Sequence, residues 1–190
     1  MFLSLGVKSV TMDDIAEKMA ISKKTIYELY KNKTALVKAT TNYVFIQIEQ
    51  AIDSICCDDC DVSAIHNLFH INEFMKQQIN EDNAPEYQMQ KYYPKIFNSM
   101  KKKKFKLITE GITENLERGI AQGLYKKDID IAVIARLYYA NLIAIKNDDI
   151  FPINKYKISD LTKLYTIYHV RAIATPNGLK ELETLLQDEI

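Results

Sequence analysis

The stretch TMDDIAEKMAISKKTIYELYKNK, residues 11–33, decides the fold of the N-terminal part of the chain. Thr11 can cap a helix that runs to about Ala20, because its hydroxyl can accept from the free amides of the first turn. The acidic residues that follow complement the helix dipole. Ser22 can cap a second, short helix in the same way. Two short helices joined by a tight turn predict a helix-turn-helix.

The apolar residues of this stretch have the spacing of a small shared core. Ala16 is small enough to permit close approach of the two helices. We expect the following side chains to pack in that core: Ile15, Met19, Ile21, Ile26 and either Leu29 or Tyr30.

The start of the second helix carries groups that suit a DNA groove, because a recognition helix offers its N-terminal residues to bases and phosphates. Lysine side chains there can contact either. Thr25 can bond a phosphate and touch a thymine methyl, while Tyr27 can reach the backbone with its phenol. Lys33 would hold a flanking phosphate. The expected DNA contacts are Thr11, Ser22, Lys23, Lys24, Thr25, Tyr27 and Lys33.

Charge is uneven along the chain, although the formal sum is zero. Residues 1–40 hold seven lysines against four acidic residues, so this segment carries +3 and the remainder −3. Such a distribution fits a cationic head that meets an anion. No arginine precedes Arg118, so we expect lysine-led binding that depends mainly on the DNA backbone.

The remainder of the chain predicts helices throughout, since apolar spacings of three and four recur and the 190 residues include only five Gly and four Pro. Thr34 should cap a long helix to about Ile55, which would link the head to the body. A further helix is expected near 63–79, and Tyr93-Pro94 should end one helix and begin another that stops at Gly123. Asp130 should cap a helix to Lys146, and Ser159 should cap a helix to Ile173. The last helix should follow Thr175-Pro176. The 131–146 helix is apolar nearly all round, so we expect it to be covered on several sides. The predicted class is all-α, with a helix-turn-helix domain at 1–42 and a helical-bundle body at 43–190.

The run from Gly6 to Leu36 resembles the DNA-binding segment of the TetR/AcrR family of transcriptional regulators. The matching positions are Gly6, Thr11, Ile15, Ala16, Ser22, Thr25, Ile26, Tyr27, Lys33 and Leu36. The segment from Tyr168 to Pro176 also resembles the C-terminal part of some members. The resemblance implies a TetR-like fold, a homodimer paired through the last two long helices, a buried effector pocket, and repression relieved by a small molecule. It also implies that Thr25, Tyr27 and Lys33 contact DNA.

The chain departs from the family pattern at three places. It begins near the end of the family's first helix, so we expect the native chain to start upstream of Met1. Ala20 stands where the turn often has glycine, and a positive φ there would cost on the order of 1 kcal/mol. Glu28 and Leu29 replace positions that are often polar or aromatic. Glu28 would repel a phosphate unless its carboxylate accepts from a cytosine amine.

An effector pocket would keep orienting polar groups within apolar stripes. Asn72 and Asn141 interrupt such stripes, and aromatic residues could complete the walls. We expect contacts to a small apolar or aromatic effector from Phe69, Asn72, Tyr92, Phe97, Tyr138, Asn141 and Tyr168. Ordinary core or dimer packing is the alternative for each of them.

Two further clusters have simpler explanations. Cys57, Cys60, His66 and His70 have the residue types of a zinc tetrad and would make a metal- or thiol-responsive regulator. However, only five residues separate the pairs, so structural roles are favoured and we expect no metal and no cofactor. The lysines at 101–104 and 106 are expected to form a solvated helix face.

The leading hypothesis is a ligand-responsive repressor that binds double-stranded DNA as a homodimer. A DNA-tethered scaffold that recruits a protein partner is the alternative. An enzyme is not expected, because the chain lacks Gly-x-Ser-x-Gly, P-loop, His-Glu-x-x-His and dinucleotide-binding motifs. An odd number of clustered cysteines and the lack of a long apolar run predict a cytoplasmic protein without membrane contact.

Overall fold

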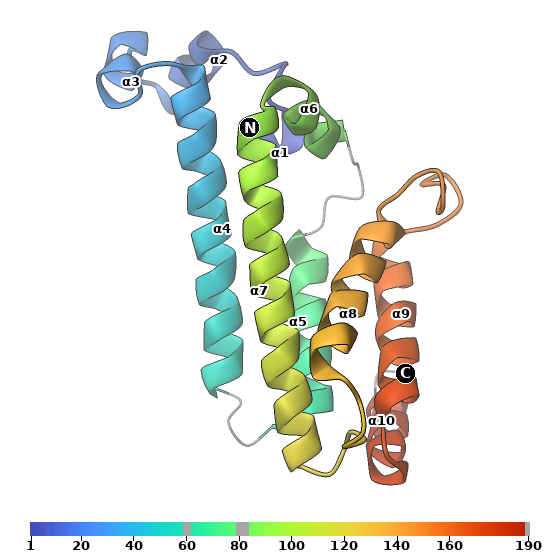
Figure 1. The fold of residues 1–190 in the computed structure, drawn as a ribbon. Coiled ribbons are helices and arrows are strands. Elements are labelled where there is room, and N and C mark those ends of the chain that lie inside the picture. The colour runs from blue at the N-terminus through green and yellow to red at the C-terminus, as the bar shows by residue number, and fades with distance from the viewer. Residues whose placement is uncertain (59–61, 79–83, 189–190) are drawn as a thin grey trace. The chain divides into compact units, whose positions relative to one another are not determined.

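The structure is a computed structural model, and it describes residues 1–58, 62–78 and 84–188. Apart from one isolated bridge between Tyr125 and Ala174, every regular element in these residues is a helix (Figure 1). The predicted all-α class is therefore confirmed. The chain forms two compact units: unit 1 comprises Met1–Gln50 and Asp82–Lys104, and unit 2 comprises Ala51–Glu81 and Phe105–Ile190. The predicted functional boundary at residue 42 stays a prediction.

Unit 1 contains the predicted helix-turn-helix. Its helices are α1 (Phe2–Leu5), α2 (Met12–Met19), α3 (Lys23–Leu29), the first part of α4 (Lys33–Asp58), α6 (Ala84–Tyr92) and the start of α7 (Pro94–Ala121). The core of unit 1 draws on all of these except the start of α7, which packs against it. Its buried side chains are Phe2, Val7, Val10, Met12, Ile15, Ala16, Ile26, Val37 and Met89.

The predicted core of the motif is only partly correct. Ile15, Ala16 and Ile26 are buried, but Met19 and Leu29 are 61% and 74% exposed, and Ile21 is exposed as well. Tyr30, rather than Leu29, packs against the core. The physical reason is that apolar side chains from outside the motif, such as Val10 and Val37, cover its inner side, so the outer apolar positions are not needed for packing.

Side-chain caps set the helix starts of unit 1, and one of them differs from the prediction. Thr11 and Ser22 cap α2 and α3 as predicted. Thr34 does not cap α4, because the helix already begins at Lys33 and the amide of Ala35 donates to Asn32 Oδ1 at 2.9 Å. Asparagine is among the strongest N-cap residues, so Asn32 takes this role.

Unit 2 is a helical bundle. It holds the remainder of α4 and α7 together with α5 (Ala64–Gln78), α8 (Ile131–Ile145), α9 (Ile158–Ile173) and α10 (Pro176–Asp188). Fifteen buried residues form its core, among them Ile65, Leu116, Tyr138, Val170 and Leu182. None of the helices in the described residues is long and apolar enough to cross a membrane.

The predicted boundaries in this part of the chain are largely confirmed. Residue 93 separates α6 from α7, and Gly123 follows α7 with φ at 74°. Asp130 accepts from the amide of Val133 at 3.1 Å, and Thr175 accepts from that of Gly178 at 3.2 Å. The Ser159 cap is wrong, because α9 begins at Ile158, with Lys157 at the N-cap position and no side-chain cap bond.

The chain itself does not cover α8 as fully as its composition predicts. Val133 and Leu137 are 49% and 51% exposed, one turn apart on α8. Leu164 and Tyr168 are 64% and 70% exposed, one turn apart on α9, which lies beside α8 (Figure 1). We refer to these four residues as the exposed α8–α9 pairs.

Candidate nucleic-acid interface

The predicted DNA-contacting residues lie on α2, on α3 and at the start of α4, all within unit 1. Thr11 and Asp14 form a capping box at the start of α2: the Thr11 amide donates to Asp14 Oδ2 at 2.7 Å, and the Asp14 amide donates to Thr11 Oγ1 at 3.1 Å. The hydrogen bonds with Thr11, and then the charge of Lys33, hold the pKa of the Asp14 carboxyl below its usual value. This box gives partners to two backbone amides that the start of α2 would otherwise leave unsatisfied.

Ala20 makes the turn between α2 and α3 in a left-handed conformation. Its φ is 54° and its ψ is 39°, and its amide donates to the carbonyls of Ala16 and Glu17. The Ile21 amide also donates to the Ala16 carbonyl, at 3.0 Å. A non-glycine residue in this region is strained by roughly 1 to 2 kcal/mol. The positive φ considered from the sequence is therefore present.

The start of α3 presents a compact set of polar groups. Ser22 Oγ accepts from the Thr25 amide at 3.0 Å, and the two hydroxyl oxygens lie 2.8 Å apart. Ile26 is buried and fixes which side of the helix faces the core. Consequently Lys24, Thr25 and Tyr27 are all exposed to solvent.

The two adjacent lysines of α3 have different surroundings. Lys23 Nζ donates to Asp13 Oδ2 at 2.9 Å, which ties the start of α3 to the first turn of α2. This hydrogen bond and the carboxylate charge raise the pKa of Lys23. In the part of the chain that the structure describes, Lys24 and Lys33 form no ion pair. Sequence reasoning missed the Lys23–Asp13 pair, although the acidic first turn of α2 could have suggested it.

The structure brings together three of the seven predicted effector contacts. Phe69, Asn72 and Tyr138 belong to unit 2, where Asn72 Nδ2 donates to Thr166 Oγ1 at 2.7 Å and lies 3.5 Å from the Tyr138 hydroxyl. A cavity of about 60 Å³ between α5 and α9 is lined by Phe69, Asn72 and Thr166, among others. We refer to Asn72, Tyr138 and Thr166, with the groups that contact them, as the polar centre of unit 2; it lies within an apolar bundle.

The other four predicted contacts lie elsewhere. Tyr92 and Phe97 belong to unit 1, where Phe97 packs against that unit's core and Tyr92 is partly exposed beneath the ammonium of Lys8. Asn141 is exposed and donates to the Leu137 carbonyl on its own helix at 2.7 Å. Tyr168 is one of the four residues of the exposed α8–α9 pairs.

His169 belongs to the polar centre and was not anticipated from the sequence. Its ring lies edge-on to that of Tyr138, with centroids 4.8 Å apart, and burial lowers its pKa to about 4. Burial also raises the pKa of Tyr138. The spacing of Thr162, Thr166 and His169 along one side of α9 was the available sequence signal.

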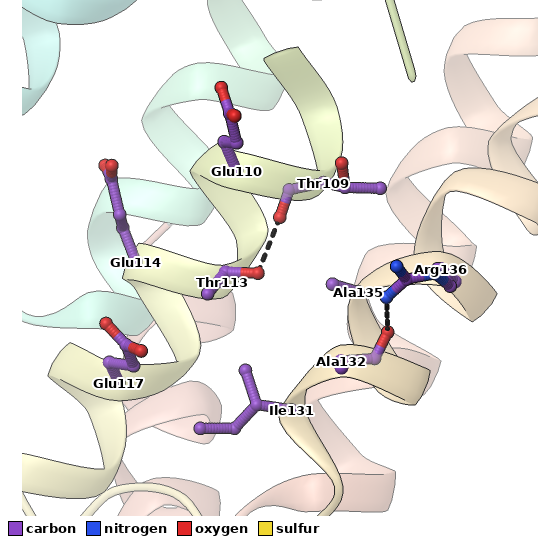
Figure 2. Close-up of a pocket in the computed structure, with 9 residues that line it drawn as sticks. All are labelled: Thr109, Glu110, Thr113, Glu114, Glu117, Ile131, Ala132, Ala135 and Arg136. Atoms are coloured by element: carbon purple, nitrogen blue, oxygen red, sulfur yellow. Dashed lines mark hydrogen bonds between the residues drawn. The ribbon is translucent and has the colours of Figure 1, made fainter. Parts of the chain in front are cut away.

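A second, larger hollow of about 610 Å³ lies between α7 and α8 (Figure 2). Figure 2 shows Thr113 and Ile131 facing its middle, while the carboxylates of Glu114 and Glu117 turn away from α8. Arg136 donates to the carbonyl of Ala132 on its own helix at 2.8 Å. The hollow is an open, shallow groove with an acidic rim.

The residues of the metal alternative are only partly described. Cys60 lies outside the described residues, as does the side chain of Cys57. His66 Nδ1 lies 3.2 Å from Glu181 Oε1 and 3.0 Å from the Ser63 hydroxyl, and His70 is exposed. The metal hypothesis is therefore untested. The lysines predicted to form a solvated face are exposed at 101–103 and 106, whereas Lys104 is half-buried. Lys103 donates to Asn42 Oδ1 at 2.9 Å.

Comparison with known proteins identifies the N-terminal segment. Residues 1–40 match the family model of bacterial regulatory proteins, tetR family. This segment includes α1, α2, α3 and the start of α4. No curated protein matches the chain.

Solved structures resemble the chain along most of its length. A transcriptional regulator from Cytophaga hutchinsonii is 14% identical, with a TM-score of 0.72 over 92% of this chain and 93% of that chain. SmeT, the repressor of the Stenotrophomonas maltophilia multidrug efflux pump SmeDEF, is 17% identical, with a TM-score of 0.71 over 93% and 86%. SmeT is also solved in complex with triclosan. The TetR-family regulator PfmR from Thermus thermophilus is 17% identical, with a TM-score of 0.61 over 90% and 92%. At these identities the likeness establishes the fold.

Proposed function

Because the chain is a TetR-family DNA-binding transcriptional regulator, we propose that it is a ligand-responsive repressor that binds a palindromic operator as a homodimer. Two copies of α3 would enter successive major grooves about 34 Å apart, one helical turn of DNA. The exposed polar start of α3, capped by Ser22, is the observation that carries this proposal. We further propose that the protein acts in the cytoplasm, where its DNA lies.

The proposed DNA contacts are the seven predicted residues, and their surroundings in the structure suggest a separate role for each group. Lys24, Thr25 and Tyr27 are exposed around the outer side of α3 and can contact bases and phosphates directly. Lys23 would first exchange its Asp13 partner for a phosphate, so its net contribution should be smaller. Thr11, Ser22 and Lys33 lie at helix starts, where amides and a positive dipole end favour phosphate.

The proposed dimer uses the exposed α8–α9 pairs. Large apolar side chains that remain exposed on two adjacent helices favour burial against another protein surface. A second copy would present the same pairs, since a twofold interface joins the same patch on both subunits. Such a contact would also cover α8 on the side that the chain leaves open.

The proposed effector site is the polar centre of unit 2. Asn72, Thr166 and Tyr138 offer donors and acceptors there. Phe69 supplies an apolar wall of the adjoining cavity, whose other lining side chains, such as Glu73 and Lys163, are polar or charged. The present cavity of about 60 Å³ is far smaller than the roughly 300 to 1,000 Å³ of typical ligand sites, so an effector would have to separate α5 from α9. SmeT, which has a similar fold, is solved in complex with triclosan. We propose that such a separation shifts α4, which contributes residues to both units, and so weakens operator binding.

The small size of this cavity also favours a second function. A DNA-tethered scaffold that recruits a protein partner needs no enclosed ligand site. Its body would bind the partner through an exposed surface instead, and no small molecule would release it from DNA.

Fluorescence anisotropy with DNA from upstream of its own gene tests the proposal. Full-length protein should bind with a strong salt dependence, because phosphate contacts release counterions. Reversing the charge of Lys23, Lys24 and Lys33 together should abolish binding, whereas reversing Lys126, Lys127 and Lys155 in unit 2 should not. Unchanged binding by the first variant would refute the proposed interface. A small-molecule screen for release of the bound DNA separates repressor from scaffold.

A further inference from the structure

Glu28 occupies an unexpected position for an acidic residue in a protein that binds DNA. Ile26 marks the buried side of α3. Positions 24 and 28 each lie two residues from Ile26, so at 100° per residue both point roughly away from the core. Lys24 and Glu28 are exposed, and their Cβ atoms should be about 5 to 6 Å apart, as for any pair one turn apart. An acid therefore shares the middle of the outer face of α3 with a lysine.

The surrounding charges leave the Glu28 carboxylate available. Within the residues that the structure describes, the side chain of Glu28 takes part in no hydrogen bond or ion pair, and neither does that of Lys24. Lys23, the other lysine at the start of α3, is held by Asp13 at 2.9 Å. A carboxylate whose role was to stabilise the head would be expected to pair with one of these lysines. Glu28 instead faces solvent on the side of α3 that the proposed operator binding would bring to DNA.

The chemistry of the major groove restricts what this carboxylate can contact. An ionised carboxylate only accepts hydrogen bonds, and it repels phosphate. Guanine presents two acceptors in the groove, and thymine presents an acceptor and a methyl group. Adenine presents one donor beside an acceptor, which would repel the second carboxylate oxygen. Cytosine presents its N4 amine with no acceptor beside it, so it is the base that best matches Glu28.

We propose that Glu28 determines operator specificity by accepting a hydrogen bond from the N4 amine of a cytosine in each half-site. This inference rests on the proposed operator binding and adds a specific base to it. The contact compensates for the repulsion between the carboxylate and nearby phosphates only at the matching base, so it discriminates against other sequences. Lys24 lies one turn earlier on the same face, and a helical turn advances about 5.4 Å. Lys24 is therefore placed to donate to a guanine that lies no more than about two base-pair steps from that cytosine.

Selection of duplexes from a random pool by the full-length protein, followed by sequencing, tests the proposal. Wild-type protein should enrich a palindrome with one strongly preferred cytosine in each half-site. Glu28→Gln should change that preference to adenine, because glutamine can bond both N6 and N7 of adenine. Glu28→Ala should lose preference at that position alone, by about 5- to 150-fold against the wild-type ratio, the range expected for one good base contact. The retained preferences elsewhere in the site show that the variants are folded.

Glu17→Gln is the matched control, since it removes one exposed negative charge from α2 of the same unit. It should leave the preference at every position unchanged. If Glu28→Gln only raises affinity for all sequences equally, as Glu17→Gln could, Glu28 is not a base-reading residue and the inference is overturned. If wild-type protein enriches no sequence, the proposed palindromic operator fails together with it.

A modified duplex tests whether the N4 amine of the cytosine is the group that Glu28 contacts. Replacing the preferred cytosine with pyrimidin-2-one removes the N4 amine. The loss of affinity should be larger for wild-type protein than for Glu28→Ala by the same 5- to 150-fold factor, which measures the coupling between carboxylate and amine. Equal losses for the two proteins would overturn the contact.

Discussion

The helix-turn-helix of unit 1 and the polar centre of unit 2 are stabilised over very different distances along the chain. In the head, the bonds that set the motif join residues three apart, as in Thr11 with Asp14, or ten apart, as in Lys23 with Asp13. In the body, Asn72 and Thr166 are 94 residues apart, and Asn72 and Tyr138 are 66 apart. Local bonds of this kind can be changed one at a time, whereas the body's bonds depend on the packing of several helices.

This difference separates the part of the protein that we propose contacts DNA from the part that we propose regulates it. A head whose helix starts are set by local caps, and whose core lies within unit 1, can keep its own shape while its placement changes. A body with a buried polar centre has groups that a ligand can compete for, since each buried donor or acceptor needs a partner. Regulation would then depend on the body, and sequence recognition on the head.

The strongest test of this division is to alter the body and measure the affinity of the protein for DNA. Leu137→Glu combined with Tyr168→Glu puts charges into both exposed α8–α9 pairs, and an unpaired charge in an apolar interface is strongly unfavourable. We expect a monomer by light scattering. Affinity for a palindromic operator should fall about 10²- to 10⁴-fold by anisotropy, because the two half-sites would no longer be bound by one molecule.

Tyr43→Glu on α4 is the control for oligomeric state, because Tyr43 is another exposed aromatic residue and lies in unit 1. It should leave the mass unchanged. A double variant that remains dimeric would place the interface elsewhere on the chain.

Acid should weaken the body before the head. The pKa of His169 is about 4 in the folded protein against an ordinary 6.5, so the unfolded chain takes up a proton that the folded chain does not. This contribution to stability is complete above pH 6.5 and is lost as the pH falls toward 4. It amounts to about 2 to 3 kcal/mol between pH 7 and 4.5. In the head, the pKa of Asp14 lies below 3.8, so its contribution is lost only at lower pH.

His169→Phe measures this contribution directly, because phenylalanine keeps a ring beside Tyr138 but cannot titrate. Urea unfolding at pH 7 and at pH 4.5 should show that the wild-type protein loses about 2 to 3 kcal/mol more than the variant does. Equal losses for the two proteins would mean that the histidine is accessible to protons in the folded state.

The same contrast explains which features could be predicted from the sequence. The Thr11, Ser22 and Asp130 caps and the break at Tyr93-Pro94 depend on neighbours within a few residues, so the pattern was sufficient for them. Thr34 is the cap predicted from the sequence where the structure has Asn32; both residue types favour caps, and nothing local decides between them. The burial of His169 and its contact with Tyr138 require the fold, and so do the contributions of Val10 and Met89 to the core of unit 1.

A smaller effect is expected from one buried hydroxyl of the body. Thr166 is fully buried; its hydroxyl accepts from Asn72 at 2.7 Å and donates to the Thr162 carbonyl at 2.9 Å. Thr166→Val keeps the shape but leaves Asn72 without this partner, which should cost about 1 to 3 kcal/mol in urea unfolding. Thr162→Val is the matched control, because the Thr162 hydroxyl donates to the Ile158 carbonyl of its own helix at 2.8 Å. If both variants lose the same amount, the long-range bond has no special importance.

The smallest effect should come from the turn of the head. Ala20→Gly relieves the left-handed strain at φ 54° but adds freedom to the unfolded chain, so the net gain should be about 0.5 to 1 kcal/mol. Ala16→Gly, four residues earlier inside α2, should instead cost about 1 kcal/mol, because glycine is a poor helix former. Amide hydrogen exchange should show both changes within residues 11–30 and none in α8 or α9. A change in the exchange of α8 or α9 would mean that the two units unfold together. Local caps would then not explain how the head keeps its shape.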